Sequence, residues 1–322
     1  MSDLLFLAFL AQHDDQAWHR AVDRLQGAIH PVDREATRVW FHLYPMRLQR
    51  ALERAADPAA LEQHLRLGGR WRLADQRDTS HHFLFGHRYW LEVCDTLRQF
   101  AGRPVAPGSL DLAAQVQEVA RTAASSLRVD VSWIVGITAI ALRTLQQVGL
   151  PEGGGTRVQN PKLRAEDDPD RVVARRERDG APGLFGFLRG RRRQWTVTFD
   201  ERQAARSFPL IDSQHLTTAA ALDTRDYRSG DARCTEGPIP VQCRSCSCGT
   251  CWVGVISGKE HLSAVDARER TTIAALGYIE SDEPRPVVRL ACMAQASGPV
   301  TIVIPPWNGQ IGTRLARTEH GA

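Results

Sequence analysis

The sequence lacks a hydrophobic run long enough to cross a membrane. Its longest apolar stretch, from Val131 to Leu142, falls well short of the roughly 20 residues that span a bilayer. The opening MSDLLFLAFLAQHDD contains a short apolar run, but no basic segment precedes it and no small-residue cleavage site follows it. We therefore expect a cytoplasmic protein with neither a spanning helix nor a secretion signal.

A marked charge of one sign is also missing. The 322 residues include 41 Lys and Arg against 37 Asp and Glu, a formal net charge of +4, and the two signs are interleaved. This balance gives no reason to expect a nucleic-acid partner. With 43% hydrophobic and 24% charged residues, the composition is that of a soluble globular protein, and the length allows two domains.

Cysteine is sparse in most of the chain, because six of the seven cysteines lie at or after residue 234. Four of them stand within the nine residues CRSCSCGTC, from Cys243 to Cys251. An odd number of cysteines bunched in this way does not make a disulfide framework. In a chain of cytosolic character, such clustering favours metal binding.

Residues 1–150 are predicted to form an all-α domain of about six helices, with a role in docking or oligomerisation. Apolar residues recur at helical spacing in the segments 14–29, 33–57, 57–69, 81–102, 109–128 and 131–149. Asp33 is a candidate N-cap for the second of these helices.

Residues 151–193 differ in composition, since they are rich in Gly, Pro and charge and carry no sustained hydrophobic period. We expect a linker or a disordered segment. It ends in GLFGFLRGRRR, where the apolar residues from Leu184 onward stand directly before arginines that end at Arg193. This end would rest on the inner face of a membrane or on an acidic partner. The plainer interpretation is a linker whose few apolar residues pack against a neighbouring domain.

Residues 194–308 are predicted to form an α+β domain, and 309–322 a C-terminal tail. Strand patterns occur at WTVTF (195–199), CWVGVISG (251–258) and VTIVIPP (300–306). The segment 263–277 between the last two is predicted to be helical, with Ser263 or Asp266 available as its cap. The expected fold class is therefore α+β overall.

The cysteine spacing disfavours two common metal sites. Cys243/Cys246 and Cys248/Cys251 are Cys-x2-Cys pairs, but Ser247 alone separates them, which is too little chain for two zinc knuckles to close on one ion. A bacterial four-iron site requires Cys-x2-Cys-x2-Cys, usually with a remote Cys-Pro, and this chain has neither.

A two-iron site fits once Cys246 is left out. Cys243-x4-Cys248-x2-Cys251 is the plant-type spacing, whose fourth ligand lies tens of residues downstream. Cys292 is the only cysteine after Cys251. In such a site one irregular loop wraps the cluster, and its backbone N–H groups offset the negative charge of the cluster.

Residues 194–308 resemble plant-type and bacterial [2Fe-2S] ferredoxin domains. The strand WTVTF, the approach GPIPVQC, the loop CRSCSCGTC, the exit strand WVGVISG and the terminal LAC and GPVTIVIPP occur in the order of that family. The resemblance implies a β-grasp fold, one [2Fe-2S] cluster and one-electron transfer. The ligands it implies are Cys243, Cys248, Cys251 and Cys292, and the loop around the cluster would comprise Arg244, Ser245, Cys246, Ser247, Gly249 and Thr250.

Three features depart from that family. Cys246 stands where the family commonly has glycine, the gap to Cys292 is longer than usual, and the segment before Cys243 is longer and contains Cys234. Cys246 would become a ligand only if the loop slipped. Cys234 and Cys94 are predicted to be buried or inert thiols, since an unligated cysteine behaves as a small hydrophobe.

Histidine is concentrated at the N-terminal end, with eight of the eleven in the first 87 residues and the densest patch in SHHFLFGHRYW. A helical bundle can hold a metal or a haem between facing helices, which is one interpretation of His81, His82 and His87. No Cys-x-x-Cys-His or His-Glu-x-x-His motif accompanies them. The plainer interpretation is a set of core or interface residues. Residues 1–150 resemble no family.

The sequence thus predicts one-electron transfer through a [2Fe-2S] cluster, in a subunit that its helical domain docks on a larger oxidoreductase complex. The redox partner would be a protein, and the chain needs no catalytic residue of its own. One alternative is an enzyme whose helical domain binds its own metal or haem and is fed by the cluster. Another is an iron–sulfur redox sensor that acts through cluster loss or oxidation of Cys246.

Overall fold

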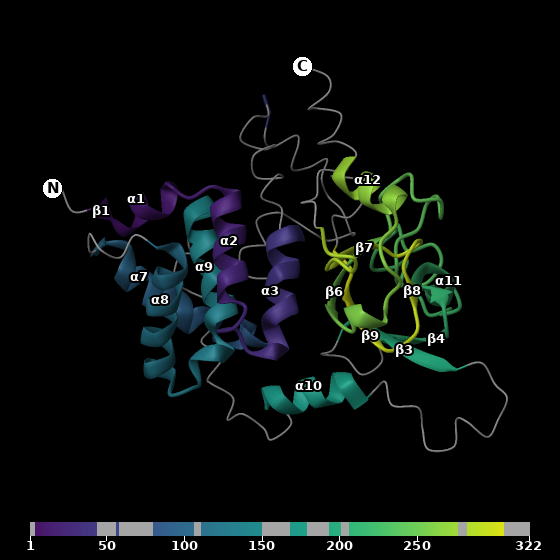
Figure 1. Cartoon of the computed structure of the whole chain (residues 1–322), viewed down its shortest axis with the longest axis horizontal. Coiled ribbons are helices and arrows are strands. Elements are labelled where there is room, and N and C mark those ends of the chain that lie inside the picture. The colour runs from purple at the N-terminus through teal and green to yellow at the C-terminus, as the bar shows by residue number, and fades with distance from the viewer. Residues whose placement is uncertain are drawn as a thin grey trace. The chain divides into compact units, whose positions relative to one another are not determined.

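The computed structural model describes residues 4–43, 56–57, 80–105, 111–149, 168–178, 193–200, 206–275 and 282–305. These residues divide into two units (Figure 1). The first unit has the described residues up to Phe41 and those from Ser80 to Val173, and the second unit has the rest. The chain is therefore a mixed α+β protein, as predicted.

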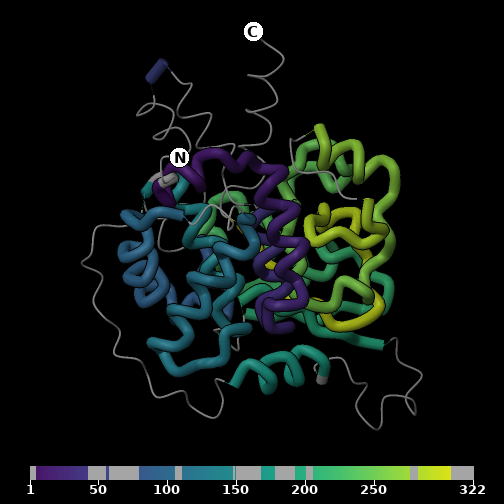
Figure 2. The backbone as a smooth tube through the Cα atoms, turned by 60° about the vertical axis from the view of Figure 1, so that its left-hand side comes forward, coloured from purple at the N-terminus to yellow at the C-terminus, as the bar shows by residue number. Residues whose placement is uncertain are grey.

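The first unit is built from helices. They are α1 (Phe6–Ala11), α2 (Asp15–Leu25), α3 (Pro31–Leu43), α7 (Trp90–Ala101), α8 (Leu112–Leu127) and α9 (Val135–Val148), with the short 3₁₀ helices η2 (Phe85–Tyr89) and η3 (Val131–Trp133). Helices α7, α8 and α9 pack against one another in all three pairs (Figures 1 and 2). The core contains Trp18, Trp40 and the apolar stretch of α9.

Two details of the first unit differ from the prediction. Strands β1 (Leu4–Leu5) and β2 (Pro104–Val105) form an antiparallel ladder that is too short to leave a period in the sequence. Asp33 does not cap its own helix, because α3 begins at Pro31. The buried Asp33 carboxylate instead accepts the N–H groups of Phe85 and Gly86, each at 2.6 Å, and so holds the start of η2.

A helix occupies part of the range that composition marks as linker. Helix α10 (Pro169–Arg178) was not predicted, and the division between the two units falls within it, after Val173. Apart from this helix, the structure describes only Asp168 and Arg193 in the range 151–193. The proposed membrane or partner contact from Leu184 to Arg193 lies outside the described residues except for Arg193. The helix predicted at 57–69 also lies outside them, apart from Asp57.

The second unit contains a five-stranded mixed sheet. Its strands are β3 (Gln194–Thr198), β4 (Ser207–Ile211), β6 (Trp252–Ser257), β7 (Val288–Leu290) and β9 (Val300–Val303), in the order β4-β3-β9-β6-β7. Strands β3 and β9 run parallel, and the other neighbours run antiparallel. A separate ladder joins β5 (Gln214–His215) to β8 (Gln295–Ala296). Helix α11 (Leu216–Ala220) packs on β4, and α12 (Ala267–Ala275) packs on β7.

Each of the three predicted strands is confirmed, at β3, β6 and β9. Strand β6 is buried over five of its six residues, which accounts for its continuous β-branched pattern. Helix α12 lies inside the predicted range 263–277, and the Asp266 carboxylate accepts the Glu269 N–H at 2.7 Å as its cap.

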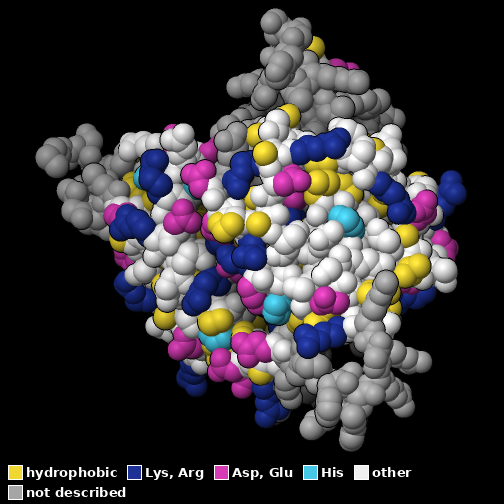
Figure 3. All heavy atoms as spheres, turned by 45° about the vertical axis from the view of Figure 1, so that its right-hand side comes forward, with side chains coloured by type: hydrophobic (Ala, Val, Ile, Leu, Met, Phe, Trp, Pro, Cys, Tyr) yellow, Lys and Arg dark blue, Asp and Glu magenta, His cyan; other side chains and the backbone are white. Residues whose placement is uncertain are grey.

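Surface charge is mixed on the face that Figure 3 presents, where Lys and Arg side chains alternate with Asp and Glu. Within the described part of the chain, no helix is long and apolar enough to cross a membrane.

Candidate metal centre

Strand pairing brings the last two predicted ligands together. Cys251 stands directly before β6, and Cys292 lies two residues after β7. Trp252 pairs with Leu290 in the antiparallel register of these strands, and the Ala291 N–H donates to the Cys251 carbonyl at 2.9 Å. Two cysteines with 40 residues between them in the chain thus lie close together at the ends of paired strands.

The four predicted ligands form two pairs of neighbouring thiols. Cys248 is close enough to Cys243, and Cys251 to Cys292, to lower the pKa of the second thiol of each pair. Cys243 and Cys248 are half-buried, whereas Cys251 and Cys292 are buried. None of the seven cysteines is in a disulfide. One pair of sulfurs therefore lies nearer to solvent and the other nearer to the core.

The loop backbone turns its N–H groups toward these sulfurs. Ser245 N lies 3.4 Å from the Cys243 sulfur and Thr250 N lies 3.5 Å from the Cys248 sulfur. The Cys246 backbone N–H contributes to a lowered pKa of the Cys292 thiol. Left-handed backbone angles make this possible, with φ of 52° at Arg244, 61° at Cys246 and 65° at Gly249. Alternation of such residues with ordinary ones produces a concave array of N–H dipoles that binds anions.

The same hydrogen bonds favour thiolates at two of the positions. Burial opposes ionisation of Cys243, but hydrogen bonds from Ser247 and from the Ser245 N–H lower its pKa to about 5. The hydrogen bond from Cys251 lowers the pKa of Cys292 and correspondingly raises that of Cys251 itself. Thiolate is the form of cysteine that binds a metal.

The remaining loop residues have distinct positions. The exposed Arg244 forms an ion pair with Glu236. The Thr250 hydroxyl donates to the Gln242 side-chain oxygen at 3.2 Å. Ser245 and Ser247 are exposed and send their N–H groups to the Cys243 sulfur.

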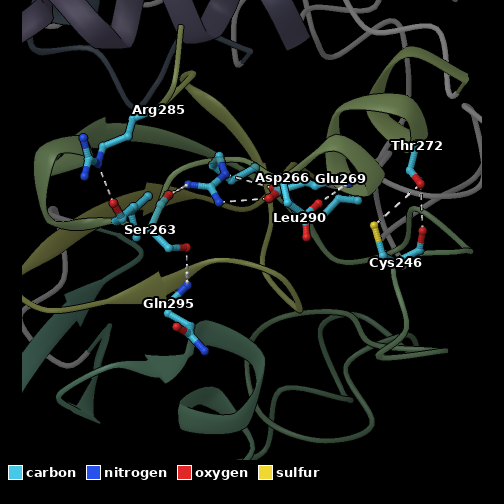
Figure 4. Close-up of polar contacts among 10 residues, drawn as sticks. Cys246, Ser263, Asp266, Glu269, Thr272, Arg285, Leu290 and Gln295 are labelled. Atoms are coloured by element: carbon cyan, nitrogen blue, oxygen red, sulfur yellow. Dashed lines mark hydrogen bonds and ion pairs between the residues drawn. The ribbon is translucent and has the colours of Figure 1, made fainter.

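The side chain of Cys246 contacts helix α12. Its thiol is 2% exposed and donates to the Thr272 hydroxyl of α12 at 3.6 Å (Figure 4). Burial raises its pKa. The left-handed φ of Cys246 is one that glycine adopts more readily than other residues. Cys246 thus contributes its backbone to the loop, while its side chain packs on a helix.

The two further cysteines lie apart from this loop chemistry. Cys234 is buried and its thiol donates to the Pro238 carbonyl at 3.3 Å. Burial raises its pKa to about 12. Cys94 is buried in α7 of the first unit. Both are buried thiols, as the sequence predicted.

Within the described residues, no group of three or more His, Cys, Asp or Glu side chains forms a site for a metal ion. A two-iron cluster bound by four cysteines places two on each iron. The four cysteines match that number of ligands, and two loop N–H groups lie within 3.5 Å of their sulfurs.

The histidine patch of the first unit is also brought together. The Nδ1 atoms of His81 and His87 lie 2.8 Å apart, and the rings of His82 and His87 have centroids 4.0 Å apart. The buried His81 stacks near Trp90, with ring centroids 3.8 Å apart. These contacts agree with the interpretation as packed residues, and the alternative of a second metal or haem stays a prediction.

The sequence analysis did not predict a buried ion pair beside the strand that leads to Cys292. Glu269 and Arg289 form an ion pair in which both side chains are at most 1% exposed. One signal was present, because Arg289 stands in the apolar run VVRLAC directly before Cys292, and a buried charge requires a partner.

Comparisons of the chain with protein-family models, with curated proteins and with solved structures find no match.

Proposed function

We propose that the second unit transfers single electrons through one [2Fe-2S] cluster held by Cys243, Cys248, Cys251 and Cys292. The observation that carries this proposal is the pairing of Cys243 with Cys248 and of Cys251 with Cys292, together with loop N–H groups that lie within 3.5 Å of the first pair of sulfurs. One pair would bind each iron. When bound, the cluster supplies a one-electron redox change.

The sheet supports a ferredoxin-like β-grasp fold for this unit. The first two strands, β3 and β4, form a hairpin, and the last strand, β9, lies parallel to β3 and between it and β6. Helix α11 follows the hairpin and packs on β4. This order of strands, with the cysteine loop before the third main strand, is the arrangement that the resemblance to ferredoxins implies.

The residues of the chain have three tasks in this function. The cysteines hold the irons, and the loop N–H groups stabilise negative charge on the sulfurs. Burial of Cys251 and Cys292 keeps water from one side of the site. The half-buried pair, Cys243 and Cys248, lies among exposed loop residues and is the side on which a protein redox partner would approach.

The first unit would dock this carrier on a larger oxidoreductase complex or mediate oligomerisation. A diffusible one-electron carrier needs no helical appendage of this size, which favours a dedicated subunit. This role places no catalytic residue in the chain.

The test is anaerobic reconstitution of the full chain, followed by counts of iron and acid-labile sulfide. We expect two of each per chain. Cys292→Ser should lose most of the iron, whereas the matched control Cys234→Ser should keep it, because Cys234 donates to Pro238 and lies outside the sulfur pairs. Equal iron in both variants, or zinc alone in the parent chain, would overturn the proposal.

A further inference from the structure

Helix α12 contacts both segments that carry the predicted ligands. On the loop side, the Thr272 hydroxyl donates to the Cys246 carbonyl at 2.9 Å and accepts from the Cys246 thiol at 3.6 Å (Figure 4). One turn earlier, Arg268 Nη2 donates to the Ser245 carbonyl at 2.6 Å. The helix therefore binds two consecutive carbonyl groups of the cysteine loop.

On the strand side, the same helix binds the residues before Cys292. The Glu269 carboxylate accepts the Leu290 N–H at 2.8 Å and Nε and Nη2 of Arg289 at 2.9 Å each (Figure 4). Arg289 Nη1 donates to the Ser263 carbonyl at 2.7 Å, which fixes the segment that leads into α12. Glu269 and Thr272 are three residues apart and so share one face of the helix.

These contacts hold the loop relative to the strand that leads to Cys292. Helix α12 binds the Cys246 carbonyl on one side and the Leu290 N–H on the other. In the same loop, Ser245 N and Thr250 N lie 3.4 Å and 3.5 Å from the sulfurs of Cys243 and Cys248, so movement of the loop relative to the helix would change these distances. The helix thus bears on how closely N–H dipoles approach the predicted cluster ligands.

We propose that α12 is a brace for the cluster, and that Thr272, Glu269 and Arg268 are positioning residues that set its reduction potential. The proposal rests on the proposed function. It also assigns a role to Cys246, whose left-handed backbone angle is held by two contacts with one hydroxyl group. The side chain at this position is then an anchor for the loop and is distinct from the four ligands.

The direction of the effect follows from charge. The reduced site carries one more negative charge than the oxidised site, so N–H dipoles aimed at the sulfurs stabilise the reduced form more. Loss of the Thr272 hydroxyl leaves the Cys246 carbonyl without its donor from α12 and loosens the loop. The potential should therefore fall.

The experiment compares three variants of the full chain with the parent. Thr272→Val has nearly the same shape but no hydroxyl, and Thr272→Ser keeps the hydroxyl. Thr271→Val is the matched control, because the neighbouring Thr271 is exposed and its hydroxyl donates only to the Ala267 carbonyl of its own helix. Midpoint potential, the paramagnetic resonance spectrum and iron content are measured on reconstituted protein. Hydrogen exchange of residues 243–251 is measured on protein without metal.

We expect Thr272→Val to lower the ratio of reduced to oxidised protein at a fixed potential by roughly tenfold, which is about 59 mV for one electron. Exchange in the loop should be faster in the same variant. Thr272→Ser and Thr271→Val should match the parent in both measurements. Loss of iron from Thr272→Val alone, with retention in Thr272→Ser, would also support the brace.

Two outcomes would overturn the proposal. One is a Thr272→Val protein with the potential and exchange of the parent. The other is faster exchange with an unchanged potential, which would leave α12 a structural element only. If the parent chain takes up no two-iron cluster, the proposed function fails, and the exchange data on metal-free protein still decide whether α12 holds the loop.

Discussion

The buried ion pair between Glu269 and Arg289 offers the sharpest test of how the second unit is held together. Both side chains are at most 1% exposed, and two hydrogen bonds of 2.9 Å join them. Opposite charges about 4 Å apart attract by about 4 kcal/mol at an effective dielectric constant of 20. Loss of one partner from a buried pair costs about 3–5 kcal/mol, because the other charge is left in the core.

Arg289→Met is the informative single variant. It leaves the Glu269 carboxylate buried with the Leu290 N–H as its donor from β7. We expect the free energy of opening around β7 to fall by about 3–5 kcal/mol, a factor of about 150 to about 4,000 in the opening constant.

The double variant Glu269→Met with Arg289→Met removes both charges at once. Its main cost is the buried Leu290 N–H, which loses its acceptor, so we expect a loss of about 1–3 kcal/mol. The double variant should therefore be more stable than Arg289→Met alone. If the two residues contributed independently to stability, the losses of the two single variants would add in the double variant.

Hydrogen exchange read by mass spectrometry on the peptide around Val288–Leu290 is the appropriate assay. The chain has two units, so a single unfolding transition does not give a defined stability for either, whereas exchange reports local opening. Exchange in Arg289→Met equal to that of the parent, or a double variant less stable than this single one, would refute the reasoning.

Three further predictions concern separate sites. Gly258→Ala should destabilise the second unit by about 1 kcal/mol or more, measured by hydrogen exchange of the peptide around β6, because Gly258 has φ of 78° and a Cβ there would lie 2.2 Å from the Pro299 carbonyl oxygen. Gly27→Ala, with nothing within 4 Å of its Cβ, is the control, and equal effects of the two would contradict the prediction. Hydrogen bonds from Arg225, opposed by burial, lower the pKa of Asp223, so its stabilisation is complete above the unfolded-chain pKa of about 3.9 and is lost as the pH falls through the lower folded value. Asp223→Asn should therefore flatten the acid limb of the stability profile, and an unchanged slope would argue against this pair. Cys243→Ser should lose iron on reconstitution while Cys94→Ser keeps it, and iron retained in both would remove Cys243 from the proposed ligands.

The sequence predicted those parts of the fold that leave a period in the chain. Strands β3, β6 and β9 alternate or are continuously β-branched, and they were found at their predicted places. Strand β4 was missed because Pro209 stands at its centre, which weakens a strand pattern. The structure shows that β4 is an edge strand with Pro209 exposed, a position that tolerates proline.

The spacing of the loop cysteines and the position of Cys292 predicted one four-cysteine site, which stays a prediction. The register of β6 and β7 brings Cys251 and Cys292 together. The support from α12 was not predictable, because Glu269 lies in the charged run DARER, which is typical of a solvated helix face. Only the fold reveals that this carboxylate is buried against Arg289.

We propose that four cysteines in two pairs hold a two-iron cluster. The most direct measurement is the electron paramagnetic resonance spectrum of the reduced full chain, recorded together with its iron and zinc content. We expect two irons per chain and the signal of a reduced two-iron cluster. Four irons per chain, or zinc with no such signal, would contradict the proposal.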